Sequence, residues 1–351
     1  MKKIAIVCQY ELLPTRIGGM DYFFWAFQKE CNRLGIVIDW YFPNQANFGE
    51  YAGFNIIAGK NPELKIIENC KKNEYEIIMT HFVELCTSFF KELKKCSNAQ
   101  IIAVDHNPRP LNGYPFKKKM IKKIKGILYS KYIDLFIGVS EYTKKEILND
   151  FGKHILNKTK VIYNGVVTTD ITKREFRNYT NPSFLVVSHL RESKGIQDLI
   201  KAVTALSVET KKDLKIDVYG DGPYKDYLLD LCGKLNVKDN FNFKGSSGDI
   251  KRVLADYDYL LHPTHMECFS LTILESLTAN VPVITTPVGG NEEVISNTGN
   301  GLIFPVQNSQ VLSEIIEKLY KGQIQIKEDT RELIEKQFSI EKMVQNYIDL
   351  L

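Results

Sequence analysis

Short apolar runs alternate with longer, polar, helix-like segments along almost the whole chain. In the first half the runs are rich in Ile and Val and lie at residues 3–9, 37–42, 76–81, 101–106 and 135–140. A second series lies at residues 184–190, 214–220, 241–245, 257–263, 281–286 and 301–305. Uninterrupted apolar strands separated by helices are typical of parallel sheets covered on both faces. The pattern predicts an α/β protein with doubly wound, Rossmann-like sheets.

The rhythm breaks once, between residues 164 and 182, where the chain is polar, irregular and contains Pro182. A chain of 351 residues also exceeds the size of one ordinary core. We therefore expect two domains, residues 1–170 and 171–337, facing each other across a cleft. A last amphipathic helix, 338–351, is expected to pack back on the first domain. In such sheets ligands bind at the carboxyl ends of strands.

Composition narrows the functional classes. Hydrophobic residues make up 44% and charged residues 25%, as in ordinary globular proteins. No apolar run reaches the ~18 residues of a membrane span, and the N-terminus lacks the features of a signal peptide. The seven cysteines include no CxxC pair, so we expect free thiols and a cytoplasmic location. A net charge of only +4 does not suggest a nucleic-acid partner.

Positive charge is nevertheless concentrated in residues 116–126. This segment carries six lysines: Lys117, Lys118, Lys119, Lys122, Lys123 and Lys125. On a helix, an apolar side would lie beside them, made of Phe116, Met120, Ile121, Ile124 and Ile127. One interpretation is a solvated helix face. The other is a peripheral attachment to an anionic membrane surface on its cytoplasmic side.

Several strand ends carry residues suited to an anionic ligand. Gly18 and Gly19 open a helix after the first strand, where a phosphate could approach the backbone, although an ordinary turn has the same pattern. His106 and Arg109 follow the fourth strand and are expected to point into the cleft. In the second half a strand is followed by His189, Arg191 and Lys194, where cations would meet phosphates at a helix start.

Two glutamates eight residues apart flank another predicted helix start. Glu267 lies in the loop after the strand at 257–263, and Glu275 lies in the first turns of a helix that begins near Ser270. The N–H groups at such a helix start suit a phosphate, and carboxylates suit hydroxyl donors. The alternative for Glu275 is a capping box with Thr272, and for Glu267 an exposed loop acid.

These motifs resemble a known family. "ECFSLTILE", residues 267–275, is similar to the E-x7-E signature of retaining GT-B glycosyltransferases of the family 4 group. "VVSHLRESKGI", "VYGDGP" and "VPVITTPVGGNEEV" resemble other segments of that family, most specifically over residues 183–305. His189 departs from the family's usual arginine, a charge that Arg191 could supply, and Ser270 departs from its usual glycine.

The resemblance implies a role for each matching residue. The catalytic residues would be Glu267, His106, Lys194 and Arg191. The donor diphosphate is expected at Gly18, Gly19, Lys194, Arg191, Phe269, Ser270 and Leu271. Glu275 would hold the ribose, and the donor sugar would contact Glu267, His106 and Cys268. The base is expected near Gly220, Gly245, Ser246 and Ser247.

The implied reaction moves a sugar, with retention, from a UDP- or GDP-sugar to an acceptor hydroxyl, without cofactor or metal. A growing cell-envelope glycan, such as capsule, exopolysaccharide or lipopolysaccharide, is the expected acceptor, either as a free saccharide or linked to a lipid. Three alternatives stay open. They are a metal-dependent enzyme using Asp256 and Asp258, or His262, His265 and Glu267; a nucleotide-sugar epimerase; and an inactive nucleotide-sugar-binding protein.

Overall fold

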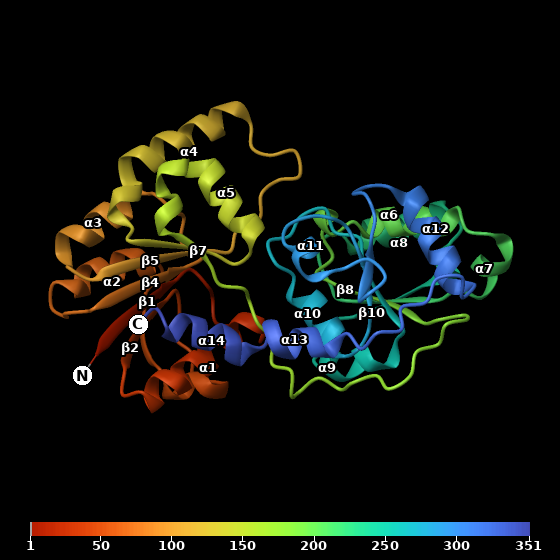
Figure 1. The fold of residues 1–351 in the computed structure, drawn as a ribbon, viewed down its shortest axis with the longest axis horizontal. Coiled ribbons are helices and arrows are strands. Elements are labelled where there is room, and N and C mark those ends of the chain that lie inside the picture. Colours follow the sequence, from red (N-terminus) through yellow and green to blue (C-terminus); the bar gives the residue numbers. More distant parts are fainter. Residues whose placement is uncertain (1) are drawn as a thin grey trace. The chain divides into compact units, whose positions relative to one another are not determined.

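A computed structural model describes residues 2–351 and divides them into two compact units. The N-terminal unit runs to Val166 and also includes Ile340–Leu351, and the C-terminal unit is Val167–Ser339. In Figure 1 the first is drawn in red to yellow with the blue helix α14, and the second in green to blue.

The N-terminal unit is built on a parallel seven-stranded sheet in the order β3-β2-β1-β4-β5-β6-β7. Its strands are β1 (Lys3–Cys8), β2 (Val37–Phe42), β3 (Asn55–Ala58), β4 (Ile77–His81), β5 (Gln100–Asp105), β6 (Leu135–Gly138) and β7 (Thr159–Val161). Its helices are α1 (Gly19–Arg33), α2 (Pro62–Cys70), α3 (Ser88–Cys96), α4 (Phe116–Tyr129), α5 (Glu141–Phe151) and α14 (Ile340–Ile348).

The C-terminal unit has a parallel six-stranded sheet in the order β10-β9-β8-β11-β12-β13. The strands are β8 (Phe184–Val187), β9 (Ile216–Tyr219), β10 (Phe241–Gly245), β11 (Tyr259–His262), β12 (Val283–Thr285) and β13 (Gly301–Ile303). The helices are α6 (Ile196–Thr204), α7 (Val208–Asp213), α8 (Lys225–Lys234), α9 (Ile250–Val253), α10 (Leu271–Thr278), α11 (Asn291–Val294), α12 (Ser309–Tyr320) and α13 (Arg331–Gln337).

Two doubly wound parallel sheets confirm the predicted fold class. The strands read as apolar runs because both of their faces are covered: β4 and β11 are buried along their whole length. The helices read as periodic because one side is buried, as in α6, where Ile196, Leu199, Ile200 and Val203 enter the core. The sequence pattern missed β3 and β7, which are only four and three residues long.

The expectation of free cysteines is wrong at one pair. Cys70 at the end of α2 and Cys96 at the end of α3 form a disulfide, with Cα atoms 6.0 Å apart. The two helices pack together, so their last residues meet although 26 positions separate them in sequence. Cys8, Cys31, Cys86, Cys232 and Cys268 are free and buried.

Candidate active site

The C-terminal unit brings Glu267 and Lys194 together at the edge of its sheet. Strands β8 and β11 are neighbours, so the loops that follow them start side by side. Lys194 lies in the first of these loops, and its ammonium forms an ion pair with the Glu267 carboxylate in the second. Both side chains are only partly exposed, at 22% and 17%. Two residues that the sequence proposed for different parts of a ligand are thus direct partners.

The environment of Glu267 keeps it ionised. His262, the last residue of β11, is buried and places Nε2 3.6 Å from Glu267 Oε1. Burial alone would raise the pKa of Glu267, but His262 and the Lys194 ammonium outweigh it and lower this pKa to about 2. Burial also lowers the pKa of His262. At neutral pH the site therefore holds a carboxylate that accepts hydrogen bonds, beside a neutral imidazole.

Close backbone packing fixes the two loops against each other. Gly195 has φ of +70°, and a Cβ there would lie 1.8 Å from the carbonyl oxygen of Pro263. His265 Nε2 contacts the buried Asp198 carboxylate at 2.6 Å, which joins the Glu267 loop to α6. A Cβ on Gly289 would lie 2.4 Å from the carbonyl oxygen of Glu267. These contacts explain why the chain carries glycines next to Lys194 and after β12.

Glu275 lies inside α10 and does not cap it. Ser270 is the N-cap residue, and its hydroxyl accepts from the Ile273 N–H at 3.4 Å. The capping box of Thr272 and Glu275 is therefore wrong, since both residues lie beyond the cap. Burial raises the pKa of Glu275 to about 7, an effect that the Lys251 ammonium on α9 partly offsets. The two glutamates thus differ in protonation at neutral pH.

A pocket of about 300 Å³ opens at the ends of β8, β9 and β10. Its walls include Ser188, His189, Tyr219, Gly220, Asp221, Ser246, Ser247, Ile250 and Thr272. Three of the residues proposed for a base, Gly220, Ser246 and Ser247, thus line one cavity. The fourth, Gly245, ends β10 with φ of +75°.

The cations after β8 differ in their surroundings. Arg191 and His189 are exposed, whereas Lys194 is half-buried. Partial burial and the neighbouring Arg191 lower the pKa of His189, so it is neutral at pH 7. A permanent positive charge in this loop therefore comes from Arg191 and Lys194.

In the N-terminal unit His106 follows β5 and meets a second histidine. His81 ends the adjacent strand β4, and its Nδ1 lies 3.0 Å from His106 Nε2. Phe82 stacks on the His106 ring at a centroid distance of 4.3 Å. Burial lowers the pKa of His106 to about 4 and that of His81 also falls. Both rings are neutral at pH 7, so one N–H is shared between them and their tautomers are linked.

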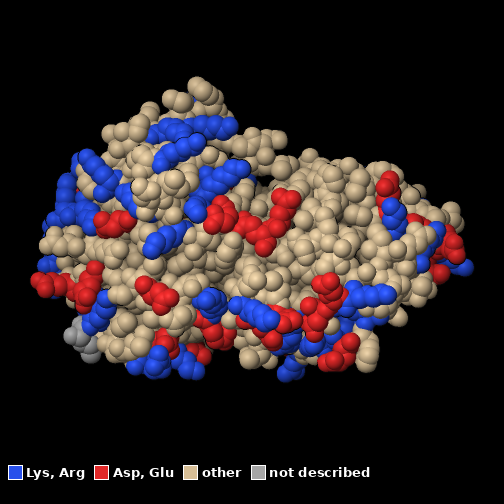
Figure 2. All heavy atoms as spheres, viewed as in Figure 1, with Lys and Arg blue, Asp and Glu red and all other residues tan. Residues whose placement is uncertain are grey.

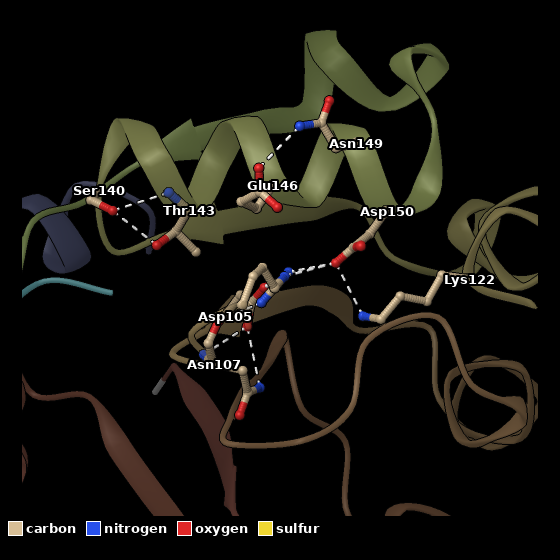
Figure 3. A network of polar contacts seen from close by, with 9 residues as sticks. Asp105, Asn107, Lys122, Ser140, Thr143, Glu146, Asn149 and Asp150 are labelled. Atoms are coloured by element: carbon tan, nitrogen blue, oxygen red, sulfur yellow. Dashed lines mark hydrogen bonds and ion pairs between the residues drawn. The ribbon is translucent and has the colours of Figure 1, made fainter. Parts of the chain in front are cut away.

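Arg109 does not present its charge to a ligand. Its guanidinium is buried and donates to the Asp105 carboxylate at 2.7 Å and to the Asp150 carboxylate at 2.8 Å. Lys122 reaches Asp150 from α4 at 3.0 Å, and Figure 3 shows the side chains of Lys122 and Asp150 pointing toward one another. The sequence led us to expect Arg109 to point into the cleft, but the structure places its guanidinium in this ion-pair network, where it holds the loop after β5 on α5.

The remaining predicted residues lie at the start of α1 and in the loop before α10. Gly18 is the N-cap of α1, and its N–H donates to the buried Asp21 carboxylate at 2.9 Å. Space around Gly18 is open, because an added Cβ would meet no atom within 4 Å. Cys268 and Phe269 are buried before Ser270. Leu271 is the first residue of α10.

Four of the residues considered as metal ligands, Asp258, His262, His265 and Glu267, contact other side chains. Asp258 is buried and forms an ion pair with Arg174 at 2.6 Å, and it accepts from the Ser183 hydroxyl at 2.8 Å. Within residues 2–351 no group of three or more His, Cys, Asp or Glu side chains has the arrangement of a metal site. Asp258 therefore serves the junction between β8 and β11.

Sequence patterns missed two residues next to the predicted ones. His81 contacts His106. This contact could have been predicted from the sequence, since β4 and β5 end at the same edge of a parallel sheet. Lys251 is the cation that acts on Glu275, but it comes from the four-residue helix α9, which no periodicity marks. Such a residue is found only once the loop after β10 is folded.

The fold is of the GT-B type. Two Rossmann-like units are the fold of GT-B glycosyltransferases, and solved structures of that fold match the whole chain. The Anabaena protein Alr3699/HepE in complex with UDP superposes with a TM-score of 0.79 over 100% of this chain and 99% of that one, at 17% identity.

The C-terminal unit is also recognised by its sequence. Residues 167–338 match the family model described as Glycosyl transferases group 1. The N-acetyl-alpha-D-glucosaminyl L-malate synthase of Bacillus anthracis is 30% identical over 50% of this chain and 46% of its own length. The lipopolysaccharide glucosyltransferase WaaG of Escherichia coli is 32% identical over 36% and 33%. The matches thus span half or less of these relatives, and the similarity to glycosyl transferases group 1 is confined to residues 167–338 in the family comparison.

Proposed function

We propose that the protein transfers a sugar, with retention of anomeric configuration, from a nucleoside diphosphate sugar to an acceptor hydroxyl. The observation that carries the proposal is the Lys194–Glu267 ion pair, with Glu275 eight residues further on and a pocket of about 300 Å³ nearby. This arrangement offers a cation for a diphosphate, a carboxylate for sugar hydroxyls and a second carboxylate for ribose hydroxyls. The group 1 domain supports the same assignment.

Binding of the donor would exchange partners within the pair. The Lys194 ammonium would turn from Glu267 to the diphosphate, assisted by Arg191 and by the N–H groups at the start of α10. Glu267, ionised because its pKa is about 2, would then accept hydrogen bonds from the sugar. The ammonium thus leaves one charged partner for another, and the carboxylate exchanges its ion pair for hydrogen bonds from the sugar, so neither charge is left without a partner.

The chemistry needs no protein nucleophile in this proposal. The bond between the anomeric carbon and the diphosphate oxygen breaks while the acceptor oxygen attacks from the same face. The departing phosphate oxygen takes the acceptor proton, so charge and protons balance. Lys194 and Arg191 stabilise the charge that develops on the diphosphate, which is the role that a metal ion has in other enzymes. His106, neutral and oriented by His81, would hold a sugar hydroxyl.

The names of relatives suggest the substrates to test. HepE was solved with UDP and with UDP-glucose, and WaaG is a lipopolysaccharide glucosyltransferase. We propose a UDP- or GDP-sugar as donor and a cell-envelope glycan as acceptor, reached from the cytoplasmic side. The exposed Arg191 would take the place of the family arginine that His189 replaces.

A thermal-shift panel of UDP-, GDP-, ADP- and CMP-sugars tests the donor site. A donor present at 100 times its Kd should stabilise the protein by about 2.7 kcal/mol, seen as a rise in Tm. Product analysis then separates the alternatives. Transfer to an acceptor supports the proposal, whereas an epimer formed without acceptor identifies an epimerase. Binding without turnover on any acceptor identifies a non-catalytic binding protein, and no stabilisation by any donor would refute the proposal.

We further propose that α4 attaches the protein to an anionic lipid surface. Phe116 and Ile127 are 80% and 71% exposed, and Met120, Ile121, Ile124 and Leu128 on the same helix are exposed as well. Figure 2 shows Lys and Arg side chains gathered over the part of the N-terminal unit where Figure 1 draws α4. No helix within residues 2–351 is long and apolar enough to cross a bilayer. An exposed apolar stripe beside lysines is typical of a helix lying in a bilayer interface.

Co-sedimentation with anionic vesicles tests this attachment. Each lysine near anionic lipid contributes about 1 kcal/mol, so binding should be strong at low salt and lost at high salt. Replacing Phe116 and Ile127 with serine should weaken it without unfolding the protein, since both side chains are exposed. The matched control replaces Phe176 and Val208, which are 87% and 82% exposed in the C-terminal unit. Wild-type protein that stays in the supernatant at low salt would contradict the attachment.

A further inference from the structure

The N-terminal unit contains a pocket that none of the roles above uses. It has a volume of about 340 Å³ and lies at the carboxyl ends of β4 and β5. Its walls are Phe82, Glu84, Leu85, Asp105, Asn107, Pro108, Arg109, Tyr114, Lys118, Lys122 and Phe151. This volume is at the lower end of the range of about 300–1,000 Å³ that small-molecule sites occupy. The edge of the sheet is also where open α/β sheets bind ligands.

The pocket wall carries uncompensated positive charge. Each acid in the wall has a basic partner: Asp105 is paired with Arg109, and Glu84 with Lys125 at 2.6 Å. Lys122 and Arg109 in turn share the Asp150 carboxylate. Lys118, in contrast, pairs with no acid among residues 2–351. The other charged side chains of the wall are neutralised by their ion-pair partners, so the Lys118 ammonium is the group left to bind an anionic ligand.

Aromatic rings hold the ammonium groups in place. Lys118 Nζ lies 4.2 Å from the centre of the Tyr114 ring, and Lys122 Nζ lies 4.8 Å from it. Lys122 also lies 5.0 Å from the Phe151 ring. Such contacts order lysine side chains that would otherwise move freely in water. The wall also contains the polar Asn107 side chain, which can hydrogen-bond to a sugar hydroxyl.

The pocket adjoins the candidate catalytic histidine. Phe82 is in the pocket wall and stacks on the His106 ring at 4.3 Å. It has φ of +58°, a left-handed conformation that is costly for a phenylalanine and that is found where surrounding structure demands it. A ligand in the pocket would therefore lie one ring away from His106, within the same unit.

We infer that this pocket binds the acceptor through a phosphate group, with Lys118 as its main contact. The acceptor class is thus a phosphorylated saccharide, supplied either as a soluble sugar phosphate or as a lipid-linked one. The inference rests on the proposed transferase function, because it assigns the second substrate of that reaction. It adds that a phosphate is required for acceptor binding and that neutral sugars bind poorly.

Lysine-labelling protection followed by mass spectrometry tests the pocket directly, with glucose 1-phosphate as the soluble probe. The probe should protect Lys118 and Lys122 saturably and leave Lys117, one position along α4, labelled. Glucose at the same concentration should not protect them. Phosphatidylcholine vesicles that contain a polyprenyl phosphate form the second arm. Protection of Lys118 but not of Lys117 by these vesicles, at lower phosphate concentrations than glucose 1-phosphate requires, would identify the lipid-linked source, because attachment of α4 to the lipid surface would protect both lysines.

The variants Lys118→Ala and Lys117→Ala form a matched pair, because both residues are exposed lysines on α4. Lys118→Ala should weaken binding of glucose 1-phosphate about tenfold or more, the effect of a lost charge-assisted hydrogen bond, and Lys117→Ala should not. Equal effects of the two variants, or equal protection by glucose, would overturn the inference.

Nucleotide-sugar stabilisation of the same variants separates the two proposals. Lys118→Ala should keep the full Tm increase with the donor, since Lys118 belongs to the other unit. Wild-type protein that binds the donor but shows no phosphate-dependent protection refutes the pocket alone. Protein that binds glucose 1-phosphate but no nucleotide sugar refutes the proposed function instead.

Discussion

Replacing Lys194 with alanine is expected to lower kcat for sugar transfer about 100- to 1,000-fold, the usual effect of removing one preorganised charge from a transition state. The Lys194 ammonium already lies in the site, held by the Glu267 carboxylate. Charge on the diphosphate grows as the glycosidic bond breaks, so the loss should fall on kcat more than on KM. Rates at saturating donor and acceptor measure this effect.

The controls for Lys194 come from the same region. Lys194→Arg keeps the charge and should retain part of the activity. Lys201→Ala removes an exposed lysine of α6 and should leave kcat unchanged. Arg191→Ala should resemble Lys194→Ala if Arg191 supplies the charge that His189 lacks. A wild-type kcat in Lys194→Ala would remove this residue from the site.

The sequence predicts the fold well because strands that are buried on both faces appear in it as uninterrupted apolar runs. It also predicts where chemistry gathers, since parallel strands end at one edge. Lys194 and Glu267 follow the neighbouring strands β8 and β11, His262 ends β11, and the structure brings the three together. The same rule places His106 beside His81.

The sequence does not reveal which charged side chains pair with each other in the folded protein. Arg109 follows a strand as Lys194 does, yet the two acids Asp105 and Asp150 bury it in an internal network. Asp150 lies 41 positions away on α5, so no local pattern reveals it. The Cys70–Cys96 disulfide has the same origin, because it depends on how α2 and α3 pack.

Protonation is also a property of the folded site. Glu267 and Glu275 look alike in the sequence, but their pKa values are about 2 and about 7. Lys194 and His262 contact Glu267 directly, whereas Lys251 only partly offsets the burial of Glu275. One carboxylate is therefore always charged near neutral pH, and the other titrates there.

Glu275→Gln is expected to change the pH dependence of both stability and donor binding. The folded-state pKa of Glu275, about 7, lies above its ordinary value, so the folded protein loses stability as pH rises from about 4.5 through 7. The glutamine variant carries no charge there, and its Tm should exceed that of the wild type at pH 8 but not at pH 5.

The affinity of the wild-type protein for the donor should rise with pH, whereas its stability falls. If Glu275 accepts hydrogen bonds from ribose hydroxyls, wild-type affinity for a UDP-sugar should rise between pH 6 and pH 8 as the carboxylate forms. The diphosphate diester of the donor does not titrate in this range, so the change reports on the protein. A charge-assisted hydrogen bond is worth about 1.5–3 kcal/mol, so Glu275→Gln should bind at least about tenfold more weakly at pH 8 and show little dependence on pH. Calorimetric titration at several pH values measures both slopes. A variant that gains stability at pH 8 yet keeps wild-type affinity would show that Glu275 is buried beside the ribose site without taking part in it.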